Sequence, residues 1–100
     1  MKITLNGVTY ETARVPASLS RLAMELNVTA LDAAEKAEAL KKDPDAKNAS
    51  ALVTLLMTNL DEKVQLIVDV FGGEFPKEQL LDELTTAEIN ALLNAIASGK

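Results

Sequence analysis

One apolar stripe in the second half of the chain constrains the fold more than any other feature. Over residues 46–71 large apolar side chains return at intervals of three and four, the period of an α-helix with one face in a core. Gly72 and Gly73 follow, and glycine readily adopts the left-handed conformation that ends a helix. The sequence predicts a helix here, either unbroken or interrupted once where Thr58 and Asp61 match a capping box. The residues expected to face the core are Ala49, Leu52, Val53, Leu56, Leu60, Val64, Ile67 and Phe71.

Three large apolar residues of the same segment lie away from that stripe. At about 100° per residue, Leu55, Leu66 and Val70 fall about 80° to 140° from Leu60. Two interpretations stay open: a neighbouring helix of the same domain covers this flank, or the flank is exposed and contacts a partner's helix. On the second interpretation, Leu55, Leu66 and Val70 are the candidate partner-binding residues.

The first eleven residues predict a β-hairpin. Asn6 and Gly7 suit the two positive φ angles of a type I′ turn, and apolar and polar residues alternate on either side of them. Pairing Leu5 with Val8 fixes the register of the two strands. Because a lone two-stranded ribbon is marginal in water, its apolar face must dock on the helices that follow. The side chains on that face are Ile3, Leu5, Val8 and Tyr10.

Two helices are expected between the hairpin and the apolar stripe. The first begins after Pro16 and stops at Asn27. The second begins at Thr29, which forms a capping-box pattern with Asp32, and its stripe consists largely of alanine. An alanine-rich stripe packs either very closely or weakly.

Two shorter helices are predicted after Gly73. One opens at Pro76 and runs through Glu83, and the last is capped by Thr85. The fold class is therefore α+β, mainly α, with the hairpin of residues 1–11 packed on four to five helices within residues 17–98. A chain of 100 residues is expected to form a single domain, residues 1–100.

Composition narrows the classes of function. The chain has no Cys and no His, which excludes disulfide frameworks, zinc fingers, thiol nucleophiles and histidine bases. A net charge of −5 argues against binding nucleic acid through its phosphates. No apolar run approaches the roughly 18 residues of a membrane span, and no signal segment precedes the hairpin. We therefore expect an intracellular protein that binds neither nucleic acid nor membrane.

The second half of the chain carries the acidic excess, and three of its carboxylates deserve comparison with a catalytic or metal site. Glu74, Glu78 and Asp82 lie four residues apart and would share one helix face. Nothing apolar surrounds them to perturb a pKa, so a solvated acidic face is favoured over a metal site or an acid–base pair. The sequence accordingly predicts no catalytic, cofactor-binding or metal-binding residues, no cofactor, and no enzymatic activity.

Three stretches resemble a known family. They are the start, MKITLNGVTYET; the Arg-x-Ala-x-Glu pattern from Arg21 to Glu25; and DEKVQLIVDVFGGEF over residues 61–75, which leads into the acidic segment 78–84. The third stretch is the most specific. Nearly end to end, the chain resembles the small tail assembly chaperones of long-tailed phages and prophages of Gram-positive bacteria.

This resemblance implies a non-catalytic protein of tail morphogenesis. Members of that family coat the tape measure protein, help to recruit tail tube subunits in the host cytoplasm, and are absent from the mature virion. A longer product made by ribosomal frameshifting often accompanies them, and the sequence leaves self-association open. An alternative is an acidic inhibitor or nucleic-acid mimic of a mobile element, whose carboxylates over residues 61–88 would imitate phosphates; its binding would weaken steeply with salt.

Overall fold

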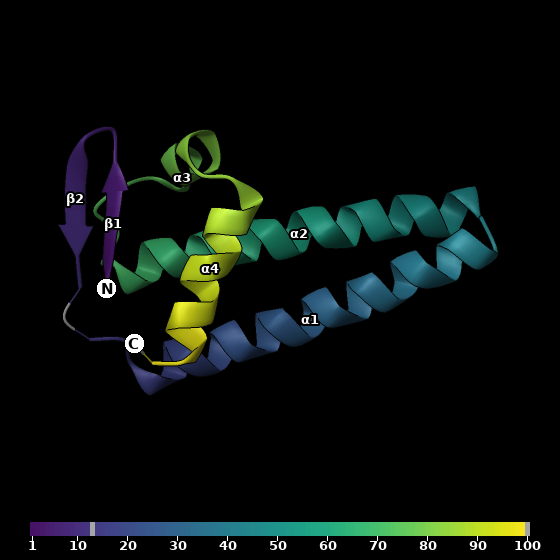
Figure 1. Cartoon of the computed structure of the whole chain (residues 1–100), viewed down its shortest axis with the longest axis horizontal. Helices are drawn as coiled ribbons and strands as arrows, with labels where there is room; N and C mark the ends of the chain where they lie inside the picture. Colours follow the sequence, from purple (N-terminus) through teal and green to yellow (C-terminus); the bar gives the residue numbers. More distant parts are fainter. Residues whose placement is uncertain (13, 100) are drawn as a thin grey trace.

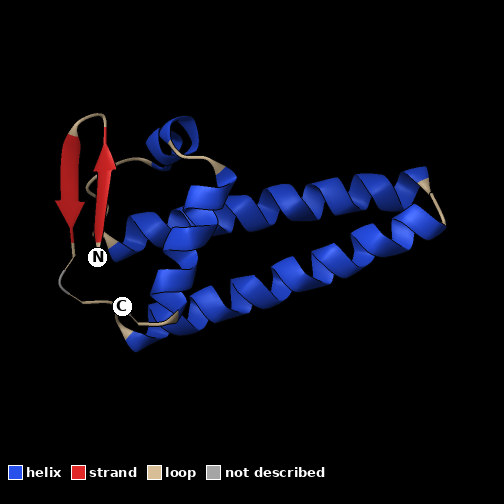
Figure 2. Ribbon diagram, in the orientation of Figure 1, coloured by secondary structure: helices blue, strands red, loops and turns tan. Residues whose placement is uncertain are grey.

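The computed structural model describes residues 1–12 and 14–99, and within them the chain forms a hairpin and four helices (Figures 1 and 2). The fold is α+β and mainly α, as predicted, with the lower of the two expected numbers of helices. The elements are β1 (Lys2–Leu5), β2 (Val8–Glu11), α1 (Ala17–Lys42), α2 (Ala46–Val70), α3 (Lys77–Glu83) and α4 (Thr86–Ala97).

The long helices α1 and α2 form an antiparallel pair that sets the elongated shape, with extents of 46 × 27 × 17 Å. Figure 1 shows α4 lying across this pair near one end, next to α3 and the β-hairpin. Beyond α4 the pair continues alone as residues 28–42 of α1 and 46–60 of α2, which we call the arm.

Helix α1 presents small side chains to α2 along most of its length. Seven of its buried and half-buried residues recur at alternating intervals of four and three, the spacing of a helix that packs lengthwise against another. Most of them are alanine, which lets the two backbones approach closely. Its alanine-rich stripe is thus the packing face of a long helix pair, and its members are Leu19, Ala23, Leu26, Ala30, Ala33, Ala37 and Leu40.

The predicted break between Asn27 and Thr29 is wrong, because α1 is continuous from Ala17 to Lys42. The two polar side chains that suggested a helix boundary have other partners. Thr29 Oγ1 donates to the carbonyl oxygen of Glu25, one turn earlier (3.2 Å), and Asn27 Nδ2 donates to Asn94 Oδ1 of α4 (3.3 Å). Both bonds are compatible with a helix interior.

Helix α2 is also unbroken, which resolves the alternative left open at Thr58 and Asp61. Between them lies Asn59, which is only 5% exposed and donates through Nδ2 to the carbonyl oxygen of Leu26 in α1 (3.1 Å). The polar residue therefore joins the two long helices. At the start of α2, Asp45 caps the helix by accepting from the backbone N–H groups of Lys47 and Asn48.

The β-hairpin has the predicted register, with Leu5 opposite Val8 and Ile3 opposite Tyr10. Asn6 and Gly7 have φ angles of 50° and 78°, as the tight turn requires. Ile3 and Leu5 are buried, but Val8 is 51% exposed, because the helices cover mainly the β1 side of the ribbon. A bond from the backbone N–H of Asn6 to Glu83 Oε1 (2.6 Å) attaches the turn to α3.

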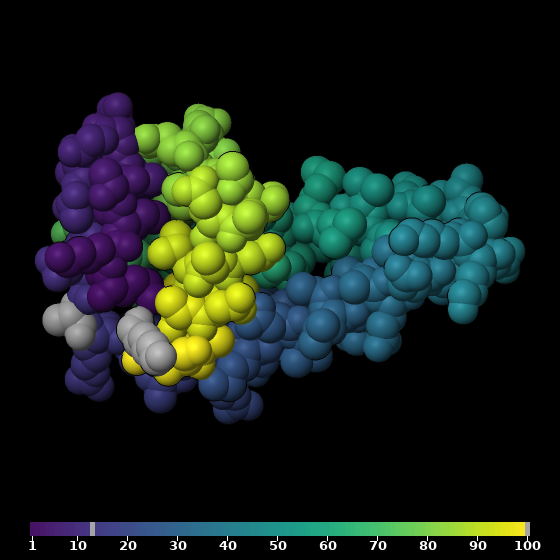
Figure 3. All heavy atoms as spheres, in the orientation of Figure 1, coloured from purple at the N-terminus to yellow at the C-terminus, as the bar shows by residue number. Residues whose placement is uncertain are grey.

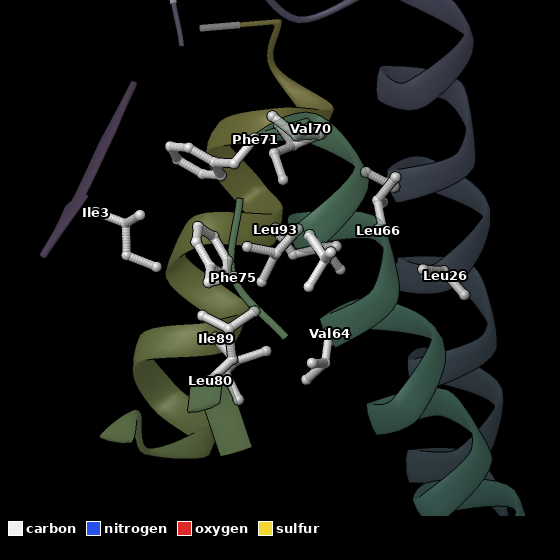
Figure 4. Close-up of a cluster of buried hydrophobic side chains, with 14 of the residues drawn as sticks. Ile3, Leu26, Val64, Leu66, Val70, Phe71, Phe75, Leu80, Ile89 and Leu93 are labelled. Carbon is white, nitrogen blue, oxygen red and sulfur yellow. The ribbon is translucent and has the colours of Figure 1, made fainter. Parts of the chain in front are cut away.

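The core lies where the hairpin, α3 and α4 meet the C-terminal half of α2 (Figure 4). Gly72 and Gly73 end α2 with φ angles of 75° and 73°, which turns the chain so that Phe75 enters this core. The larger buried side chains of the cluster include Ile3, Leu5, Leu26, Val64, Leu66, Ile67, Val70, Phe71, Phe75, Leu80, Ile89, Leu93 and Ile96.

Helix α4 begins with the predicted capping box, and this contact gives a test of the fold. Thr85 Oγ1 accepts from the backbone N–H of Glu88, while Glu88 Oε1 accepts from the N–H of Thr85. We expect Thr85→Ala to lower the free energy of unfolding by about 1 kcal/mol in a urea titration. The matched control is Thr86→Ala, one residue inside the helix, and an equal loss in both variants would contradict this role for Thr85.

Candidate protein-binding surface

The structure separates the three residues that were predicted to bind a partner. Leu66 is 1% exposed and Val70 is 7% exposed, and both belong to the hydrophobic core. At these two positions the flank is therefore covered and not exposed. Figure 4 shows Leu66 lying between α2 and α1, so a helix of the same chain covers this flank, the first of the two interpretations.

Leu55 lies further along α2, in the arm, and is half-buried. It lines a cavity of about 470 Å³ between the ends of α1 and α2, together with Leu40 and Leu52. Of the three predicted residues, only Leu55 is therefore accessible from a concave surface. Its role in binding a partner stays a prediction.

The burial of Leu66 predicts a stability effect that Leu55 does not share to the same degree. We expect Leu66→Ala to cost about 2–5 kcal/mol of unfolding free energy, because it leaves a cavity in the core. Leu55→Ala, at a half-buried site, should cost clearly less. Chemical denaturation followed by far-UV circular dichroism measures both values, and comparable losses would show that Leu55 is as much a core residue as Leu66.

The main stripe of α2 was predicted to face the core throughout, and only its C-terminal half does. Val64 and Ile67 are fully buried, whereas Val53 and Leu56 are 55% and 48% exposed. The reason is the position of the covering elements: α3, α4 and the hairpin lie against the C-terminal half of α2, and the arm extends past them (Figure 1). Val53 and Leu56 were expected in the core, but they are exposed, because no element within residues 1–12 and 14–99 covers this part of α2.

Helix α1 contributes a second exposed apolar stripe. Met24, Val28 and Leu31 are 52%, 57% and 66% exposed, and their spacing of four and three residues places them on one face. Met24 lies one turn after Ser20, whose Oγ donates to the carbonyl oxygen of Ile96 in α4 (2.7 Å). A turn displaces a side chain by only about 40° around the axis, so the stripe faces the side on which α4 packs.

The exposed stripe of α2, which contains Val53, Leu56 and Met57, faces that same side. It continues the row of Val64 and Ile67, which belong to the core beneath α4. The two stripes together form what we call the arm surface. It contains six of the large apolar side chains that the described part of the chain exposes: Met24, Val28, Leu31, Val53, Leu56 and Met57. Figure 3 shows the bare arm projecting from the rest of the molecule. The sequence signal for half of it was the repeat of Met24, Val28 and Leu31 at intervals of four and three.

A buried cation stands where the arm meets α4. Lys63 is only 7% exposed, and its Nζ donates to Asn90 Oδ1 of α4 (2.9 Å). Burial lowers the pKa of this ammonium group from its ordinary value. Within residues 1–12 and 14–99 no carboxylate forms an ion pair with it. Lys63 lines a pocket of about 310 Å³. The other residues that line it are Leu56, Met57, Asn59, Leu60, Thr86 and Asn90.

The acidic residues considered as a possible metal or acid–base site are solvated. Glu74, Glu78 and Asp82 are all exposed. Among the residues that the structure describes, no group of three or more carboxylates is placed to hold a metal ion. In the same ranges no helix combines the length and apolar character that crossing a membrane requires. The described part of the chain instead offers the exposed apolar side chains of the arm surface and the pocket lined by Lys63. These features suit the binding of another protein.

Comparison with known protein families identifies the family to which this chain belongs. The model of a family described as phage tail chaperone protein matches residues 1–99. The chain therefore belongs to the phage tail chaperone family, which confirms the resemblance to phage tail assembly chaperones and is consistent with a protein that is not an enzyme. No curated protein and no solved structure shows significant similarity to the chain.

Proposed function

We propose that this protein binds the tape measure protein through the arm surface and helps to recruit tail tube subunits while the tail is assembled in the host cytoplasm. It would leave the assembly before the virion is complete. Membership in the tail chaperone family supports the general role. The observation that supports tape measure binding in particular is an exposed apolar surface on a pair of long helices.

The arm surface suits a helical client with an apolar face. Val53, Leu56 and Met57 lie on one side of a helix that has no covering element over this segment. A client helix placed beside them would bury the apolar side chains of both proteins, in the manner of an amphipathic helix in a groove. Such contacts would shield a long, aggregation-prone client until it is assembled.

The charge of the chain supports the same role. An apolar surface on a small protein favours self-association unless charge keeps the molecules apart. The net charge of −5 provides that repulsion, and all of it lies in the second half of the sequence, because acidic and basic residues cancel in the first half. The protein can thus expose apolar side chains and remain dispersed.

A charge placed in the arm surface tests tape measure binding. We expect Leu31→Asp and Leu56→Asp each to abolish co-purification with the tape measure protein encoded by the same genome, because a client would have to desolvate the new carboxylate. The helical circular dichroism should be retained, since both side chains are exposed. The matched control is Leu22→Asp, at a leucine 40% exposed on α1 and about 180° around the helix from Leu31. Loss of binding in the control but not in Leu31→Asp would refute the assignment of the surface.

The salt dependence of binding separates this proposal from an acidic inhibitor or nucleic-acid mimic. Apolar contacts are not screened by ions, so affinity for the tape measure protein should change little between low and high salt. A mimic that binds a basic partner through the exposed carboxylates of residues 61–88 would instead weaken steeply. Titration by fluorescence anisotropy at several salt concentrations measures the slope, and a steep slope would favour the mimic.

A further inference from the structure

We propose that the pocket at the base of the arm receives an aspartate or glutamate side chain from an apolar helical segment of the client, and that Lys63 pairs with this carboxylate. The inference rests on the proposed function, since the client is the tape measure protein. It adds the chemistry by which a client segment would be recognised and the residue that would select it.

Lys63 occupies an environment that leaves its charge poorly compensated. An ammonium group has three N–H donors, and the structure gives Nζ one partner, the neutral amide oxygen of Asn90. A charge removed from water is costly unless it is paired and hydrogen-bonded. Glu88, in the first turn of α4, is engaged with Thr85 in the capping box. A carboxylate from another protein would supply the missing charge.

The position of Lys63 connects this charge to the arm surface. Its pocket is lined by Leu56 and Met57, which belong to the arm surface, and by Thr86 and Asn90 of α4. A carboxylate in the pocket would therefore be flanked on one side by the apolar stripe and on the other by α4. Val53 precedes Lys63 by ten positions, or about 15 Å along the helix, so about three turns of a client helix would cover both.

Charge favours a client over a second copy of this chain as the occupant. Each copy carries a net charge of −5, and like charges oppose the approach of two copies. A client segment with one carboxylate among apolar residues meets less of this repulsion. Such a client segment also matches the arm surface, where a row of apolar side chains leads to the ammonium group of Lys63.

The test replaces the charge but keeps the aliphatic stem. Lys63→Met is compared with Lys47→Met, the same change at an exposed lysine of the same helix. Affinities are measured by fluorescence anisotropy, with the full-length protein and overlapping peptides that together span the tape measure protein. We expect Lys63→Met to bind the best peptide about ten- to hundredfold more weakly, the range for losing a charge-assisted hydrogen bond. Lys47→Met should bind like the wild type.

A substitution in the peptide identifies the carboxylate. Changing its Asp or Glu residues to the corresponding amides, one at a time, should weaken binding to the wild type at one position and have little further effect with Lys63→Met. Thermal unfolding controls for the fold. Lys63→Met removes a desolvated charge but also one hydrogen bond to the exposed Asn90, so its melting temperature should stay close to that of the wild type, and weaker binding then cannot be attributed to unfolding.

The outcomes distinguish this inference from the function on which it rests. If no tape measure peptide binds the wild type, both the proposed function and the pairing with Lys63 are wrong. If peptides bind wild type and Lys63→Met equally well, the client is confirmed and only the role of Lys63 is overturned. If sedimentation shows dimers of the wild type that Lys63→Met abolishes, the pocket receives a second copy and the proposed occupant is wrong.

Discussion

The packing of α1 along α2 is the contact on which the rest of the structure depends. Helix α2 has two apolar faces, and α1 covers one of them with a row of alanine and leucine side chains. The second face is then free to form the core with the hairpin, α3 and α4. Helix α4 lies across the pair near one end, and α3, with seven residues, and the hairpin lie at that same end. These elements therefore cover only the C-terminal half of the second face, and the arm surface is what they leave uncovered.

Polar side chains inside the helices hold these elements in register. Ser20 and Asn27 of α1 bond to α4, Asn59 of α2 bonds to α1, and Lys63 of α2 bonds to α4. Side-chain hydrogen bonds are directional, whereas apolar packing alone would tolerate sliding of one helix along another. Asn27 and Asn59, which lie where the sequence suggested a helix end or a break, are therefore connections between helices in the structure.

Local features were predictable from the sequence, and features that depend on which helix packs where were not. The hairpin register follows from Asn6 and Gly7, the end of α2 from Gly72 and Gly73, and the start of α4 from the capping box at Thr85, because each involves only neighbouring residues. The continuity of α1, the burial of Leu66 and the exposure of Val53 depend on the lengths and positions of distant elements. Periodicity reveals that a helix has two apolar faces, but it does not reveal which of them is covered.

The separation of the core from the arm has a consequence for how such a protein can evolve. The core residues Val64, Ile67 and Leu93 lie at one end of the molecule, while Leu31 and Val53 lie on the arm, which buries few side chains. If the arm surface binds the client as proposed, substitutions on it would change what the protein binds at little cost to its stability. Lys63 lies at the junction, fixed by α4 but lining the pocket of the arm. A chaperone built in this way can follow changes in its client's sequence while the fold that presents the surface stays constant.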